Sequence, residues 1–213
     1  MFDLIIRNGK IITGAGNPWF KADIAVKNGE IAEIGYITQD AGKTIDAKGY
    51  AVSPGIIDLH DHSDSTILVD REATSKVHMG VSTTTFPSCG SGTAPLNKEM
   101  REHMRRTQPF LEEAGININW STVEEYFALL ESKGISINVA PLIAFGTVRQ
   151  YVMGMAMRAP TPAELEEMKR QVEIGMKAGC RGITTGLRYD PQSYANTEEV
   201  IEVSKVAAKY GGF

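Results

Sequence analysis

The stretch Ser53-Pro-Gly-Ile-Ile-Asp-Leu-His-Asp-His62 decides how the chain folds and where its chemistry lies. Pro54-Gly55 predicts a turn, and the apolar, β-branched residues that follow predict a buried strand. Because alternate residues of a strand project to the same side, we expect His60 and His62 to share one face. Two imidazoles spaced in this way can bind one divalent metal ion. The alternative is two unrelated surface histidines, but two of only four histidines fall together here, which favours a metal site.

The composition excludes several classes of protein. Lys and Arg number 22 against 26 Asp and Glu, and the net charge of −4 argues against nucleic acid as a partner. Two cysteines in a chain of 213 residues make no disulfide framework, which is typical of a reducing compartment. Residues 1–7 carry charge where a signal peptide needs an apolar core, and no apolar run reaches membrane-spanning length. We therefore expect a cytoplasmic protein with no membrane partner.

Residues 1–53 show β patterns and no helical period. Asn8-Gly9 and Asn28-Gly29 each stand between apolar runs, and Asn-Gly supplies the positive φ angles of a type I′ turn. Each pair therefore predicts a β-hairpin, and two more short strands are expected at 44–46 and 50–52. We interpret residues 1–53 as a small β-sandwich segment that needs further strands to close.

From residue 54 onward, strand and helix patterns alternate. Strands are expected at 56–57, 81–86, 136–143 and 182–187, and helices at 96–106, 121–133, 162–178 and 197–209. Ser121-Thr-Val-Glu124 and Thr161-Pro-Ala-Glu164 are the capping boxes that open two of these helices. Such alternation predicts an α/β fold with a parallel sheet, either doubly wound or a (β/α)₈ barrel. A full barrel needs about 250 residues, so residues 54–213 provide about half of one.

Cys89 is the second candidate ligand, because it stands directly after the predicted strand at 81–86 and is followed by Gly90. In a barrel this position lies on the same rim as His60 and His62, where active sites occur. A thiolate is a strong zinc ligand, whereas the alternative is an inert buried cysteine. Cys180 precedes a strand, on the opposite rim, and we assign it to the core.

Other polar residues near these positions leave alternatives open. Asp61 and Asp64 either orient an imidazole from behind or are simply solvated. His78 and His103 have no ligand spacing and are expected at the surface or in packing. Arginines also follow the predicted strands, namely Arg149, Arg158 and Arg188. Each can pair with a substrate carboxylate or lie free at the surface, and Tyr189 is the better candidate for contact with a substrate at the rim.

Several stretches together resemble a known family. They are Asp3-Leu-Ile-Ile-Arg-Asn-Gly-Lys-Ile, Ala22-Asp-Ile-Ala-Val, Gly29-Glu-Ile-Ala-Glu-Ile-Gly35, Ile45-Asp-Ala-Lys-Gly49, the stretch 53–62, Gly80-Val-Ser-Thr-Thr, Cys89-Gly and Gly182-Ile-Thr-Thr-Gly-Leu-Arg-Tyr189. The chain resembles the amidohydrolase superfamily and, within it, the N-acyl-D-amino-acid deacylases (D-aminoacylases). His-x-His alone indicates only an amidohydrolase, while Cys89 and the Thr-Gly-Leu-x-Tyr stretch are more specific to the deacylases.

The resemblance implies a fold, a cofactor and a substrate. Residues 1–53 would be a small β-sandwich segment, and residues 54–213 the first half of a metal-dependent (β/α)₈ TIM barrel. His60, His62 and Cys89 match metal ligands for zinc, as one or two divalent ions, and Tyr189 matches a position near the substrate. The implied reaction is hydrolysis of the amide bond of small-molecule N-acyl-D-amino acids.

The same resemblance places further groups outside the chain. The remaining ligand histidines and the catalytic aspartate are expected beyond Phe213, so the 213-residue chain alone should be inactive. It should need the rest of its chain, or a partner chain, to close the barrel. Two alternatives remain: a cyclic-amide hydrolase related to hydantoinase or dihydroorotase, and a non-catalytic half barrel. Cys89 counts against the first alternative, because that branch favours a lysine ligand.

Overall fold

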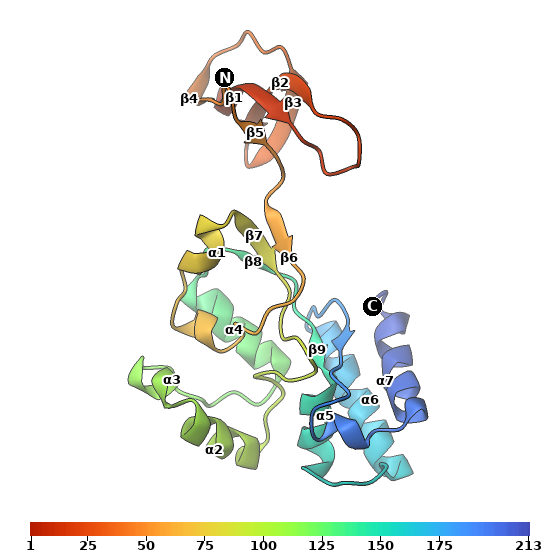
Figure 1. The fold of residues 1–213 in the computed structure, drawn as a ribbon. Coiled ribbons are helices and arrows are strands. Elements are labelled where there is room, and N and C mark those ends of the chain that lie inside the picture. Colours follow the sequence, from red (N-terminus) through yellow and green to blue (C-terminus); the bar gives the residue numbers. More distant parts are fainter. The chain divides into compact units, whose positions relative to one another are not determined.

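The computed structural model describes residues 1–213, which divide into two compact units, Met1–Gly55 and Ile56–Phe213 (Figure 1). The first unit contains β1 (Phe2–Ile11), β2 (Phe20–Lys27), β3 (Glu30–Gly35), β4 (Ala41–Asp46) and β5 (Ala51–Val52). The second contains the strands β6 (Ile56–Asp58), β7 (Val81–Thr84), β8 (Asn138–Val139), β9 (Ile143–Ala144) and β10 (Ile183–Thr184). Its helices are α1 (Thr74–His78), α2 (Lys98–Thr107), α3 (Pro109–Glu113), α4 (Val123–Lys133), α5 (Phe145–Met153), α6 (Pro162–Lys177) and α7 (Thr197–Lys209), with 3₁₀ turns η1 (Thr66–Leu68) and η2 (Gln192–Tyr194).

The first unit is a mixed five-stranded sheet. Its order is β3-β2-β1-β4, and the short β5 also pairs with β1. β1 runs antiparallel to β2 and parallel to β4 and β5. Its buried core is small, formed by Ile5, Ala25 and Ile37. All five strands belong to the β-rich segment that the sequence predicts, and β4 and β5 lie close to the two short strands expected there.

The two Asn-Gly pairs of this unit have different structures. Asn28 and Gly29 have φ angles of 55° and 80° and join β2 to β3, so the predicted hairpin is confirmed. The hairpin predicted at Asn8-Gly9 is wrong, because β1 runs without interruption through these residues. Asn8 has a φ of 62°, and the register with β2 shifts between Ile6 and Gly9, as in a β-bulge.

Contacts from other strands explain why the chain does not reverse at Asn8. Its backbone N–H donates to Asp23 Oδ1 at 2.8 Å, and its side-chain Nδ2 donates to Asp46 Oδ1 at 2.9 Å. Asp23 lies on β2 and Asp46 on β4, the two neighbours of β1. The bulge is therefore held from both sides of the strand, which a local turn propensity does not reveal.

The second unit has two open parallel sheets, β6-β7-β8 and β9-β10, and no closed barrel. The single strand predicted at 136–143 is split into β8 and β9, with Pro141 between them, which has no N–H to donate. The Ala140 N–H still donates to the carbonyl of Thr84, the last residue of β7, and the Leu142 N–H donates to the carbonyl of Phe86, just beyond β7. The four expected parallel segments are present, and those predicted at 81–86, 136–143 and 182–187 are shorter than the sequence suggests.

The sequence predicts a buried first strand in this unit, and that prediction is wrong. The side chains of Ile56 and Ile57 are 55% and 58% exposed. β6 is an edge strand of its sheet, so only one of its two long edges has a neighbouring strand, which is β7.

The helices follow the predicted caps closely. The Thr161–Glu164 capping box of α6 is confirmed, with Pro162 in the first turn. The box of α4 lies one residue later than predicted, at Thr122 and Glu125, and Glu125 also accepts the N–H of Ser121. The apolar stripe of α6 contributes buried methionine and valine side chains to the core, and this helix packs against α5 and α7 (Figure 1). None of the helices combines the length and the apolar character that crossing a membrane requires.

Candidate metal centre

His60, His62 and Cys89 lie together in the structure. Their potential ligand atoms are all within 4.8 Å of one another. Cys89 Sγ is 3.5 Å from His60 Nε2, and the two imidazole rings meet edge to face with centroids 5.3 Å apart. Both histidines are exposed and Cys89 is partly exposed. The three side chains singled out from the sequence therefore form one cluster that is open to solvent.

The histidines reach this cluster by a route that the sequence did not predict. β6 ends at Asp58, so His60 and His62 lie in the bend after the strand, and strand alternation does not place them. Instead, the His60 N–H donates to Asp58 Oδ1 at 3.1 Å. The Asp61 N–H donates to the Ser88 hydroxyl at 3.0 Å, which links the histidine bend to the loop that carries the cysteine.

Asp61 and Asp64 have roles other than the two considered from the sequence. Both are buried, and neither has a hydrogen bond with an imidazole. Asp61 accepts from the Thr84 hydroxyl at 2.7 Å and from Ser63. Burial raises the pKa of Asp61, but bonds from Ser63, Thr84 and Lys76 outweigh that effect and leave it below its usual value. Asp64 accepts the Thr93 N–H at 2.9 Å, and burial raises its pKa to about 6.

Lys76 is a supporting residue that the sequence reasoning missed. Its Nζ lies 2.7 Å from Asp58 Oδ2 and 3.1 Å from Asp61 Oδ1, so one ammonium group holds two carboxylates next to the histidines. The lysine lies on α1, and no spacing or motif in the sequence connects it with the cluster. It is therefore found only from the fold.

Cys89 has an unusual backbone. Its φ is +55°, and a residue other than glycine in this left-handed region costs about 1–3 kcal/mol. Such strain persists only where surrounding contacts hold it, and it is frequent at functional sites. Cys180, by contrast, is 4% exposed and belongs to the hydrophobic core, as expected.

Tyr189 opens onto the same hollow as two of the candidate ligands. The hollow has a volume of about 300 Å³. Its lining comprises His62, Cys89, Gly90, Ser91, Gly146, Thr147, Gln150, Tyr189, Asp190, Pro191 and Gln192. The Arg188 guanidinium lies 5.6 Å from the centroid of the Tyr189 ring, within the range of a cation–π contact.

The other arginines and histidines lie outside this pocket. Arg149 is completely buried and pairs with Glu199 at 2.9 Å, so it is neither a rim contact nor a surface arginine. Arg158 is at the surface and pairs with Glu164 through both terminal nitrogens. His78 and His103 are exposed.

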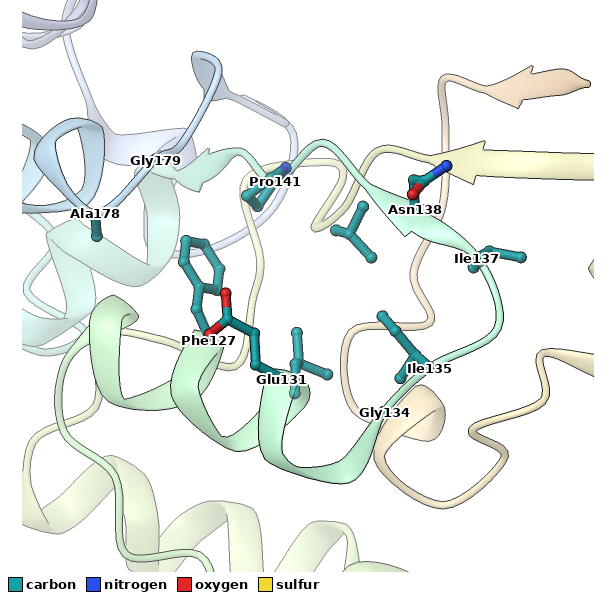
Figure 2. A pocket seen from close by; sticks show the side chains of 11 residues that line it. Phe127, Glu131, Gly134, Ile135, Ile137, Asn138, Pro141, Ala178 and Gly179 are labelled. Atoms are coloured by element: carbon teal, nitrogen blue, oxygen red, sulfur yellow. The ribbon is translucent and has the colours of Figure 1, made fainter. Parts of the chain in front are cut away.

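A larger hollow of about 530 Å³ lies between the end of α4, β8 and the end of α6 (Figure 2). Figure 2 shows apolar side chains around it, including Phe127, Ile135 and Ile137. Asn138 already donates to the Ser82 carbonyl, and no histidine or cysteine reaches this hollow. The smaller pocket beside the His-Cys cluster is therefore the better candidate site.

The donor set of the cluster fits zinc. Zinc prefers imidazole nitrogen and thiolate sulfur, and around one tetrahedral ion such atoms lie about 3.3–3.6 Å apart. The 3.5 Å between Cys89 Sγ and His60 Nε2 agrees with that spacing. Partial exposure leaves room for a substrate or water beside the three side chains.

Comparisons with known proteins find relatives of one family. No protein-family model matches the chain. It is 35% identical to a D-aminoacylase of Alcaligenes xylosoxydans xylosoxydans over 99% of this chain and 43% of that protein. A crystal structure of D-aminoacylase aligns with a TM-score of 0.88 at 31% identity, covering 100% of this chain and 44% of the other. N-acyl-D-glutamate deacylase from Bordetella bronchiseptica, solved with zinc and a phosphonate that mimics the tetrahedral intermediate, aligns with a TM-score of 0.86 at 33% identity, covering 98% and 43%.

The similarity covers this chain and the relatives to different extents. It takes in nearly the whole of this chain, but the chain spans only about two fifths of the length of these relatives. The identity of 31–35% runs through both units, so the likeness is one of sequence as well as of fold. These findings confirm the family that the sequence stretches indicated. The chain belongs to the D-aminoacylase family of the amidohydrolases.

Proposed function

We propose that this chain is part of a zinc-dependent hydrolase that cleaves the amide bond of N-acyl-D-amino acids. The observation that supports the proposal best is the His60, His62 and Cys89 cluster, which borders the same pocket as Tyr189. The relatives named D-aminoacylase and N-acyl-D-glutamate deacylase support the substrate class. In this proposal residues 1–53 belong to a β-sandwich, and residues 54–213 are the first half of a (β/α)₈ barrel.

The three clustered side chains would hold one or two divalent ions. A bound zinc ion supplies a Lewis acid that polarises a carbonyl and activates water near neutral pH. Tyr189 provides an aromatic wall and a hydroxyl that can donate to a substrate oxygen. Arg188, stacked on that ring, adds a positive charge that favours the carboxylate of an N-acyl amino acid.

This chain lacks a free general acid or base in the pocket. Asp190 is the carboxylate that lines it, and Asp190 accepts bonds from the hydroxyl groups of Ser193 and Tyr194. The proposal therefore places the catalytic aspartate outside residues 1–213. It also requires either the rest of the chain or a partner chain to cover the open edges of the two parallel sheets.

The test uses the protein as its gene encodes it, loaded with zinc, and N-acetyl derivatives of D- and L-amino acids. We expect acetate release from the D-series at about 1 s⁻¹ or faster, with little from the L-series. A chelator should abolish turnover and added zinc should restore it. Residues 1–213 alone should be inactive.

Other outcomes would contradict the proposal. Ring opening of hydantoins without deacylation would support a cyclic-amide hydrolase instead. Failure to hydrolyse either substrate class, with zinc bound, would support a non-catalytic role.

A further inference from the structure

Gln192 is a buried amide directly behind Cys89. The side chain is 1% exposed and lies at the start of η2. Its Nε2 donates to the carbonyl of Cys89 at 2.9 Å. Its Oε1 accepts the backbone N–H of Gly186, just beyond β10, at 2.7 Å. One side chain therefore joins the cysteine loop to the end of a neighbouring strand.

Three glycines leave the space that this arrangement needs. A Cβ on Gly90 would overlap the Gln192 amide, and a Cβ on Gly146 would lie 2.5 Å from Gln192 Cγ. A Cβ on Gly186 would overlap the Cys89 carbonyl oxygen. The cysteine loop, the start of α5 and the end of β10 thus approach one another closely around a single amide group.

The hydrogen bond from Gln192 is made to the residue of the site that has a strained backbone, Cys89. Cys89 holds a φ of +55°, and the Gln192 bond fixes the carbonyl of that same residue. From the other side, the Thr147 N–H donates to the Gly90 carbonyl at 3.2 Å, and the Thr147 hydroxyl accepts the Gly92 N–H at 2.8 Å. The direction of the Cys89 thiol therefore depends on these backbone bonds.

Gln192 also connects to the segment that carries Tyr189. The Tyr189 N–H donates to the Gly186 carbonyl at 2.9 Å, while the Gly186 N–H donates to Gln192. The Ser193 N–H in turn donates to the Tyr189 carbonyl at 2.9 Å. The Gln192 amide thus fixes the position of Cys89, a candidate ligand, relative to the segment of Tyr189, a candidate substrate contact.

We propose that Gln192 is a positioning residue that orients the Cys89 thiolate toward the metal. This inference rests on the proposed metal site and adds a residue that acts through the Cys89 backbone, from the wall of the pocket. It differs from a purely structural role because it predicts a change in the metal–thiolate bond itself. Supporting residues of this kind typically change metal affinity by about 10- to 100-fold.

The experiment compares four variants of the protein as its gene encodes it, titrated with Co²⁺ in place of zinc. Gln192→Met removes both bonds at similar size, and Gln192→Glu keeps the acceptor for Gly186 but loses the donor to Cys89. Gln171→Met is the matched control, because Gln171 is also buried but bonds to Glu167 on α6. Cys89→Ala is the reference. The readouts are Co²⁺ affinity, the near-ultraviolet thiolate-to-cobalt absorption and the circular dichroism spectrum.

We expect both Gln192 variants to bind Co²⁺ about 10- to 100-fold more weakly, with less thiolate absorption per bound ion. Gln171→Met should match the unmodified protein in both readouts. Wild-type affinity and absorption in a folded Gln192 variant would overturn the inference. If Gln192→Met does not fold, Gln192→Glu decides alone. The reference separates the two hypotheses: if Cys89→Ala leaves the affinity and the absorption unchanged, the metal site itself is wrong.

Discussion

The two cysteines of this chain differ in almost every property that governs thiol chemistry. Cys89 follows β7, is partly exposed, has a φ of +55° and lies 3.5 Å from an imidazole nitrogen. Cys180 precedes β10, is 4% exposed and packs in the hydrophobic core. Burial raises the pKa of the Cys180 thiol to about 12. One end of the parallel strands therefore presents a thiol to ligands, while the other end uses the same residue type as a small apolar side chain.

The comparison shows that position in the fold determines the chemistry of a cysteine. At the carboxyl ends of the strands, bends and glycines bring backbone, imidazole and thiol close together. At the amino ends, helix α6 packs against the start of β9, because Gly175 leaves room for the Ile143 side chain directly against the helix. If the two environments are separate, reagents, metal and mutations should affect the two cysteines differently.

The largest difference should appear in alkylation. At pH 8 a thiol with a pKa of about 12 is ionised in about one molecule in 10⁴, and burial also blocks the reagent. We therefore expect iodoacetamide to modify Cys89 at least about 100-fold faster than Cys180 in the folded protein. Peptide mass spectrometry at timed intervals measures both rates.

Zinc provides the control for this experiment. Bound zinc should slow the reaction of Cys89 and leave that of Cys180 unchanged, because only Cys89 lies in the cluster. Comparable rates for the two cysteines, or equal protection by zinc, would remove the distinction between the two ends.

Local chemistry explains how much of this site the sequence could predict. His60, His62 and Cys89 stand out because their residue types suit zinc and because each follows a predicted strand. The route was mistaken, since β6 ends before the histidines and a bend positions them. That bend depends on the bond from the Asp61 N–H to Ser88, and on Lys76, contacts between segments that are distant in sequence. Periodicity cannot reveal them.

The same limit appears in the fold. Asn8-Gly9 and Asn28-Gly29 are identical dipeptides, yet one forms a bulge and the other a turn. Only the strands on both sides of Asn8 distinguish them. Arg149 shows the limit for charge: its partner Glu199 lies on α7, so no local pattern predicts a fully buried ion pair.

A pair of glycine substitutions should give the next largest effects. Gly175→Ala places a Cβ against Ile143 and 3.8 Å from Cys180 Sγ, which should cost about 1–3 kcal/mol of overpacking, with at most about 1 kcal/mol returned by helix propensity. Gly186→Ala pushes on the Cys89 carbonyl and should weaken zinc binding by about 10-fold or more. Urea unfolding and chelator competition measure the two effects.

Each glycine variant is the control for the other. Gly175→Ala should retain zinc affinity, because the affected side chains lie in the core and not in the cluster. If it weakened zinc binding as much as Gly186→Ala, the two ends of the strands would be mechanically coupled, and the comparison between the cysteines would fail.

The smallest effect concerns the pH dependence of stability. The folded pKa of Cys180, about 12, lies above its ordinary value of 9.0, so the folded state holds the proton more tightly than the unfolded state. The stability that this thiol contributes is therefore fully present below pH 9 and is lost as the pH rises from 9 toward 12. The loss should amount to about 1.4 kcal/mol at pH 10. We expect this decline in a Cys89→Ala background, where Cys180 is the only thiol within residues 1–213, from urea unfolding at pH 8, 9 and 10. Adding Cys180→Ala should lower the stability at pH 8, because it leaves a cavity, but should make its decline with pH shallower by about that amount. Parallel declines in the two proteins would mean that Cys180 is not held as a neutral core thiol, and the contrast with Cys89 would rest on exposure alone.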